Sequence, residues 1–156
     1  MEYYRWIVFI HIIAASAFVM TVIIMQLVVA NVMKRIPDSS GKQDGARFIQ
    51  KKWLPVVDII IILVGIAGLG LVALNYNMIL SRPLFLVKIV IGAITLSAAY
   101  INHFYLRSLK KRLASSGKES ERLKRVGRIV LILNKVILIG APVTALLGWY
   151  ANHVAG

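Results

Sequence analysis

The sequence contains no cysteine, and only six of its 156 residues are acidic. Without cysteine, the chain cannot form disulfides, thiolate metal sites, iron–sulfur clusters or covalent c-type haem attachments. Any redox centre that it holds must therefore be bound by other side chains. Against the six acidic residues stand 19 lysines and arginines, which give a formal net charge of +13.

Apolar residues make up 59% of the chain, more than a soluble domain of this size could bury. Four apolar runs are long enough to cross about 30 Å of hydrocarbon as helices. The first is too long for a signal peptide and lacks a cleavage site, so it should also span the membrane. The sequence thus predicts an all-α protein, a transmembrane up-and-down four-helix bundle in one domain, 1–156. Its predicted spans are about 4–32, 54–76, 83–106 and 127–150.

Basic residues are concentrated in two stretches between the spans, 33–53 and 107–128. The opposite side carries only Arg5 and Arg82. By the positive-inside rule both basic stretches are predicted to be cytoplasmic and both termini to lie outside, in a prokaryotic plasma membrane. The stretches lack interleaved aromatic residues, so we expect them to attract anionic lipid headgroups and expect no nucleic-acid partner.

Ionisable residues inside the spans are costly and usually face the interior of a bundle. Five occur here: His11, Asp58, Lys88, His103 and Lys135. At a rise of about 1.5 Å per residue, His11 and Lys88 each lie roughly 8 to 10 Å below the outer surface and share one layer. His103 lies roughly 20 Å further along the membrane normal, too far to ligate the same haem iron as His11.

The layer of His11 is the candidate cofactor site. A neutral imidazole is a good ligand for haem iron, and Ala14 and Ala15 beside it leave room for a flat ligand. Lys88 could be the second ligand if burial frees its amine, or it could pair with a haem propionate. His153, just past the fourth span, could instead approach the iron from the other side.

Each ionisable residue also has a structural interpretation. His11 and His103 could simply hydrogen-bond a neighbouring helix. Asp58 could neutralise Lys135 or act in a proton relay. Lys88 could extend its ammonium group to the headgroups. The sequence leaves these alternatives open.

Three segments resemble a known family: "HIIAASAF" in the first span, "WLPVVDIIIILVGIAGL" in the second and "RPLFLVKIVIGAITLSAAYINHFY" in the third. They are similar to the small membrane proteins related to HemJ-type protoporphyrinogen oxidase and the CopD copper-resistance membrane domain. In the HemJ group, a histidine early in span one and a lysine early in span three are associated with b-type haem. His11 and Lys88 match these positions, and Arg47 is the nearest match to an important arginine before span two.

We therefore expect a b-type haem-binding redox protein that transfers electrons or oxidises a hydrophobic substrate such as a porphyrinogen. If it is an enzyme, it is an oxidoreductase. The expected cofactor-binding residues are His11, Lys88, Arg47, Ala14 and Ala15. One alternative is a copper-handling protein with His11, His153 and methionines as ligands; another is an accessory subunit of a membrane complex. Membrane lipid, a hydrophobic small molecule, a redox protein or a second copy of the chain are the expected partners.

Overall fold

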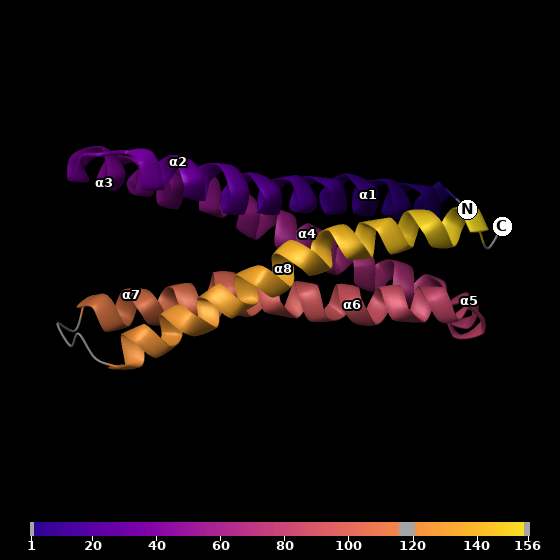
Figure 1. Cartoon of the computed structure of the whole chain (residues 1–156). Helices are drawn as coiled ribbons and strands as arrows, with labels where there is room; N and C mark the ends of the chain where they lie inside the picture. Colours follow the sequence, from indigo (N-terminus) through magenta and orange to yellow (C-terminus); the bar gives the residue numbers. More distant parts are fainter. Residues whose placement is uncertain (1, 116–120, 155–156) are drawn as a thin grey trace. The chain divides into compact units, whose positions relative to one another are not determined.

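The structure, a computed structural model, describes residues 2–115 and 121–154, apart from the side chains of residues 2, 78, 80, 114–115 and 151–154. Within these ranges nearly every residue is helical and there is no strand. The prediction of an all-α chain is confirmed. Figure 1 shows the order of the helices along the chain.

Four helices are long and apolar enough to cross a membrane, as the sequence predicted. Each exceeds the roughly 20 residues that the hydrocarbon core requires, so the chain is an integral membrane protein. The helices are longer than the predicted spans because an apolar run marks only the part that is compatible with hydrocarbon. They comprise Tyr3–Arg35, Ser39–Leu74, Pro83–Leu113 and Glu121–Tyr150.

Large apolar side chains are exposed along all four long helices. In water such continuous apolar surface would favour aggregation, whereas in a membrane it contacts acyl chains. Lipid is therefore the partner of these faces. Examples are Phe9, Ile59, Ile66, Leu69, Ile94, Leu131, Ile139 and Leu146, all more than half exposed.

The first two long helices form an antiparallel pair, which we call the first hairpin (residues 2–74; Figure 1). Both helices contain a short π-helical segment near the connection that joins them. In order, the elements are α1 (Glu2–Ile23), the π-helical η1 (Ile24–Val29), α2 (Ala30–Arg35), α3 (Ser39–Phe48), the π-helical η2 (Ile49–Trp53) and α4 (Leu54–Leu74).

Glycines of α4 allow α1 to approach closely. A Cβ atom added at Gly68 would lie 3.4 Å from Cε1 of His11, and one added at Gly70 would lie 3.7 Å from Cγ2 of Ile7. Such small residues bring two helix backbones together where lipid supplies no hydrophobic driving force. The buried side chains of this hairpin are Ala14, Phe18, Thr21, Val22, Val57, Ile61 and Ala67.

The connection of the first hairpin is more helical than the sequence suggested. The polar composition of the segment "PDSSGKQDG" is typical of a solvated loop, but α3 occupies most of it. Asp38 is the reason, because its carboxylate accepts a hydrogen bond from the backbone N–H of Gly41 at 3.0 Å and another from the Ser40 hydroxyl. This is an N-cap, which satisfies N–H groups that the first turn of a helix leaves without a partner.

The last two long helices form the second hairpin (residues 83–154; Figure 1), and the short α5 (Tyr76–Ser81) precedes it. The first helix of this hairpin begins at Pro83, a position where the missing N–H of proline costs nothing. The elements are α6 (Pro83–Tyr100), the π-helical η3 (Ile101–Leu106), α7 (Arg107–Ser115) and α8 (Glu121–Val154).

In the second hairpin, larger side chains of each helix pack against glycines of the other. A Cβ atom added at Gly140 of α8 would lie 3.2 Å from Cβ of Thr95, and one added at Gly92 of α6 would lie 3.3 Å from Cγ2 of Thr144. The hydroxyls of Thr95 and Thr144 donate to carbonyl oxygens four residues earlier in their own helices. Thr144 therefore packs on Gly92 through its methyl group, whereas Thr95 faces Gly140 with its hydroxyl group first, and both hydroxyls stay satisfied.

By its internal contacts the chain divides into two compact units, Met1–Leu86 and Val87–Gly156. The first contains the first hairpin and α5, and the second contains most of α6 together with α7 and α8. Each hairpin is a packing unit of its own.

Candidate functional site

His11 lies on α1, and its half-buried imidazole packs against α4 at Gly68. Cε1 and Nδ1 of the ring are 3.4 and 3.7 Å from the position of a Cβ atom at Gly68, and Nδ1 is buried. Because this edge of the ring is turned toward α4, Nε2 is the ring nitrogen that does not contact Gly68. Glycine at position 68 thus leaves room for the imidazole against α4.

The two alanines expected beside His11 are on the same side of α1, three and four residues further along. Ala14 is only 5% exposed, whereas Ala15 is half-buried. The surface of Ala14 is therefore already covered by protein and serves packing. Of the two, Ala15 has surface left to offer a ligand.

Lys88 lies on α6, and the end of its side chain rests against α8 at Gly148. Its Nζ and Cε atoms are 2.8 and 3.0 Å from the position of a Cβ atom at Gly148. Any larger residue at position 148 would therefore displace the ammonium group. In the second hairpin, as in the first, a glycine of the returning helix makes room for the basic side chain of the outgoing helix.

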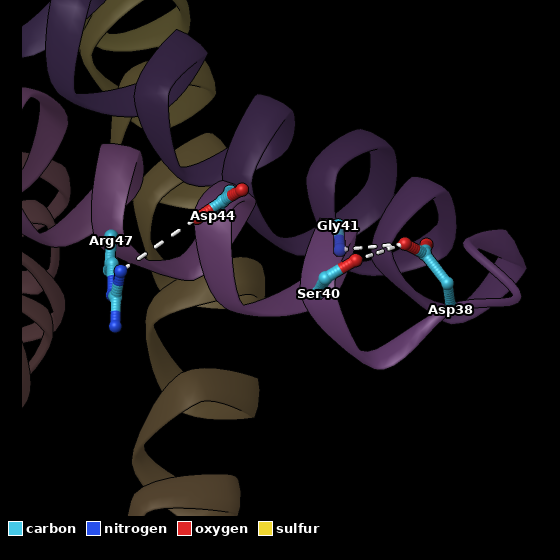
Figure 2. A network of polar contacts seen from close by, with 5 residues as sticks. All are labelled: Asp38, Ser40, Gly41, Asp44 and Arg47. Atoms are coloured by element: carbon cyan, nitrogen blue, oxygen red, sulfur yellow. Dashed lines mark hydrogen bonds and ion pairs between the residues drawn. The ribbon is translucent and has the colours of Figure 1, made fainter.

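Arg47 lies on α3 in an exposed position. Its Nη1 atom is 3.9 Å from Oδ1 of Asp44, one turn earlier, and the two side chains are 71% and 79% exposed (Figure 2). Such a surface ion pair contributes little to stability. Along the returning helix Arg47 precedes Gly68, the contact of His11, by roughly 30 Å of helix. The structure does not bring Arg47 to His11.

The other ionisable residues lie at some distance along their helices from His11 and Lys88. His103 is half-buried in η3 and follows Lys88 by about 22 Å of helix. Asp58 is half-buried on α4, nearly three turns before the glycine that His11 contacts. Lys135 is exposed on α8.

The structure gives little information on the predicted metal ligand His153. The side chain of His153 lies outside the described residues, although α8 extends to Val154. Among the side chains that are described, no three histidine, aspartate or glutamate residues form a group that could hold a metal ion.

The structure also shows a polar contact that the sequence did not reveal. Nδ2 of Asn102, in η3, donates to Oδ1 of Asn134, on α8, at 2.7 Å. An amide inside an apolar run is costly unless it finds a partner, and that cost is the signal that could have marked both residues. Which amide would pair with which depends on the alignment of the two helices.

A shallow groove is present on the surface of α6 and the start of η3. Its lining is apolar apart from the hydroxyl groups of a serine and a tyrosine, and none of the predicted site residues contributes to it. The residues are Leu96, Ser97, Tyr100 and Ile101. The groove is therefore separate from the candidate site.

These features define an integral membrane protein with four long helices in two hairpins, each hairpin placing one basic side chain against a glycine. Comparisons with known protein families, with characterised proteins and with solved structures found no match.

Proposed function

We propose that this chain binds b-type haem through His11 and takes part in electron transfer or in the oxidation of a hydrophobic substrate. The observation that supports it is the contact of the imidazole with Gly68, 3.4 Å from Cε1 to the position of a Cβ atom. A ligand held in one orientation by packing loses little freedom when it binds iron, which favours binding. Haem, when bound, supplies the electron-transfer chemistry.

The donor set of the chain suits this cofactor. With no cysteine, imidazole is the strongest haem ligand that the chain offers within its spans. Ligation through Nε2 leaves the contact between His11 and Gly68 in place. His11 would hold the haem iron, and the half-buried Ala15 beside it on α1 would contact the macrocycle.

Lys88 and Arg47 enter this proposal through the sequence resemblance alone. Lys88 would pair with a propionate or occupy the second coordination position, and Arg47 would act as the arginine that precedes the second span. The resemblance is to the small membrane proteins related to HemJ-type protoporphyrinogen oxidase. It suggests that a hydrophobic substrate of this chain would be similar to a porphyrinogen. The basic stretches would face the cytoplasm, as the positive-inside rule predicts.

Visible spectroscopy on the full chain in detergent tests the proposal. Spectra of oxidised and reduced protein are recorded before and after addition of haemin, with haem and copper content measured on the same samples. We expect a Soret band with sharp bands on reduction. Copper without haem would favour the copper-handling alternative. The absence of both haem and copper would favour an accessory subunit. Either result would overturn the proposal.

Histidine variants test the ligand itself. His11→Ala should lose the haem signal, and His103→Ala should keep it, because the sequence predicts a separation of roughly 20 Å along the membrane normal between these two histidines. Circular dichroism and size-exclusion profiles show whether each variant is folded. If His103→Ala loses haem while His11→Ala retains it, the assignment of the ligand is wrong.

A further inference from the structure

The first helices of the two hairpins have matching features at one constant offset in the sequence. The offset from His11 to Lys88 is also the offset from the first residue of η1, Ile24, to the first residue of η3, Ile101. The last residues of the two π-helical segments are related in the same way. π-Helical segments are rare and short. Two of equal length, each equally far after a basic intramembrane residue, are not expected of two unrelated helices.

The same offset relates buried and charged positions. Among the buried residues, Phe18, Thr21 and Val22 of α1 correspond in this alignment to Thr95, Ala98 and Ala99 of α6. The basic residues that flank the helices correspond as well. The pairs are Arg5 with Arg82, Lys34 with Lys111 and Arg35 with Arg112.

The returning helices correspond at a second, slightly larger offset. Buried Val57 and Ile61 of α4 match buried Ile137 and Ala141 of α8, and Gly68 matches Gly148. The small difference between the two offsets falls in the connections between the helices, where insertions are tolerated.

Helical periodicity alone does not produce this agreement. Any two amphipathic helices can be aligned at several offsets that differ by one or two turns, because apolar positions recur every three or four residues. The π-helical segments, the basic flanks and the glycine contacts have no such periodicity. In the first helices the π-helical segments, the basic residues and three buried positions select one offset, and in the returning helices two buried positions and the glycine contacts select another. The π-helical η2 has no counterpart in α8.

We infer that the two hairpins are copies of one structural unit, and that the contact of Lys88 with Gly148 is the counterpart of the contact of His11 with Gly68. Each copy presents one basic side chain from its first helix against a glycine of its second helix. Positions 11 and 88 are therefore structurally equivalent. We call each of them, together with the glycine that it contacts, a seat. The seat at position 88 accommodates an imidazole, and the seat at position 11 accommodates a lysine.

A test without any cofactor uses the glycines. Gly68→Leu and Gly148→Leu should each lower the unfolding temperature of the full chain in detergent, because the new side chain collides with the residue in the seat. Truncation of that residue, by His11→Ala or Lys88→Ala in the same chain, should remove at least half of the loss in both hairpins. Gly127→Leu is the matched control, since nothing lies within 4 Å of a Cβ atom there.

Relief in both hairpins supports equivalent seats. Relief in one hairpin only, or in neither, overturns the inference. The measurement does not depend on whether the protein binds haem, so its outcome is independent of the proposed function.

A second test exchanges the two seat residues and rests on the proposed function. His11→Lys alone should lose the haem signal, and the double variant His11→Lys/Lys88→His should regain it. If the unaltered chain takes up no haem, the proposed function fails while the glycine test still decides the repeat. If the unaltered chain binds haem and the folded double variant does not, the functional equivalence of the seats is wrong.

Discussion

The two hairpins have the same arrangement of helices, but the contacts between the helices differ. In the first, α1 meets α4 through aliphatic side chains, the ring of His11 and glycines, with Thr21 as its buried polar residue. In the second, α6 meets α8 through two threonines packed on glycines and through the hydrogen bond from Asn102 to Asn134. Glycine contacts are common to both, and the second hairpin also has the hydrogen bond between two amide side chains.

This difference shows how one hairpin frame can carry different chemistry. Helices in lipid associate through close packing and interhelical hydrogen bonds, because acyl chains are as apolar as leucine. The first hairpin is joined by packing over a long seam, so no single contact dominates. The second concentrates its contacts at a few positions. Substitutions at those positions should therefore cost more than comparable substitutions in the first hairpin.

The largest expected effect is that of Gly140→Ala in the second hairpin. The added methyl group would lie 3.2 Å from Cβ of Thr95 and closer still to its hydroxyl, so the helices must separate. Overpacking of this kind costs about 1–3 kcal/mol of unfolding free energy. Thermal or denaturant unfolding in detergent measures it.

Gly70→Ala in the first hairpin is the control, since its methyl group would meet Ile7 at an ordinary contact distance of 3.7 Å. Alanine also favours a helix over glycine by about 1 kcal/mol, so this variant should be neutral or more stable. Equal losses at positions 140 and 70 would contradict the difference between the hairpins.

A smaller effect is expected of Asn134→Leu. It removes the acceptor of the hydrogen bond from Asn102 and leaves that amide in an apolar environment, at a cost of about 0.6–2 kcal/mol. The double variant Asn102→Leu/Asn134→Leu should recover part of the loss, because no unpaired amide remains. Unfolding of the single and double variants measures both quantities.

The matched control for this pair is Asn31→Leu in the first hairpin. Asn31 donates only to the carbonyl oxygen of Leu27 in its own helix and is exposed. Its loss should change stability by a few tenths of a kcal/mol at most. A cost equal to that of Asn134→Leu would show that the bond between the helices has no special weight.

The smallest expected effect is local and depends on pH. Hydrogen bonds from the Ser40 hydroxyl and the backbone N–H of Gly41 hold the pKa of Asp38 below its usual value (Figure 2). A carboxyl group whose pKa is lower in the folded state stabilises that state above its unfolded pKa of about 3.9, and the stabilisation is lost as pH falls through the folded value. The start of α3 should therefore loosen in acid.

Hydrogen exchange at the amide of Gly41 between pH 5 and pH 2 measures this loosening, after correction for the intrinsic exchange rate. Asp38→Asn should keep the cap but lose its pH dependence, because an amide side chain does not titrate in this range. Asp44→Asn should behave like the unaltered chain. Protection that stays constant in the unaltered chain down to pH 2 would contradict the assigned cap.

Much of the fold could be predicted from local features of the sequence. Four apolar runs predicted four long helices, and the predicted start of the third span, at about residue 83, agrees with the start of α6 at Pro83. Composition is a poor guide at the connection before α4, where polar residues typical of a loop form the helix α3. The N-cap by Asp38 depends on the geometry of three successive residues, which a count of polar residues does not capture.

The candidate site was predicted residue by residue but not contact by contact. His11 and Lys88 could be selected because a charged or polar group in hydrocarbon is costly wherever it lies. The glycines that they contact lie far along the chain. The sequence could not identify these glycines, because each returning helix contains several glycines that were equally plausible partners. Haem binding by these residues stays a prediction.

The sequence by itself determined that lipid surrounds this protein, how many long helices it has and that it lacks thiolate ligands. These features follow from length, hydropathy and composition, which can be read from single segments. Only the tertiary structure decided that His11 meets Gly68, that Lys88 meets Gly148 and that Asn102 meets Asn134. Such pairs depend on how one helix is aligned against another, and that alignment is set by the close packing of all the side chains between them.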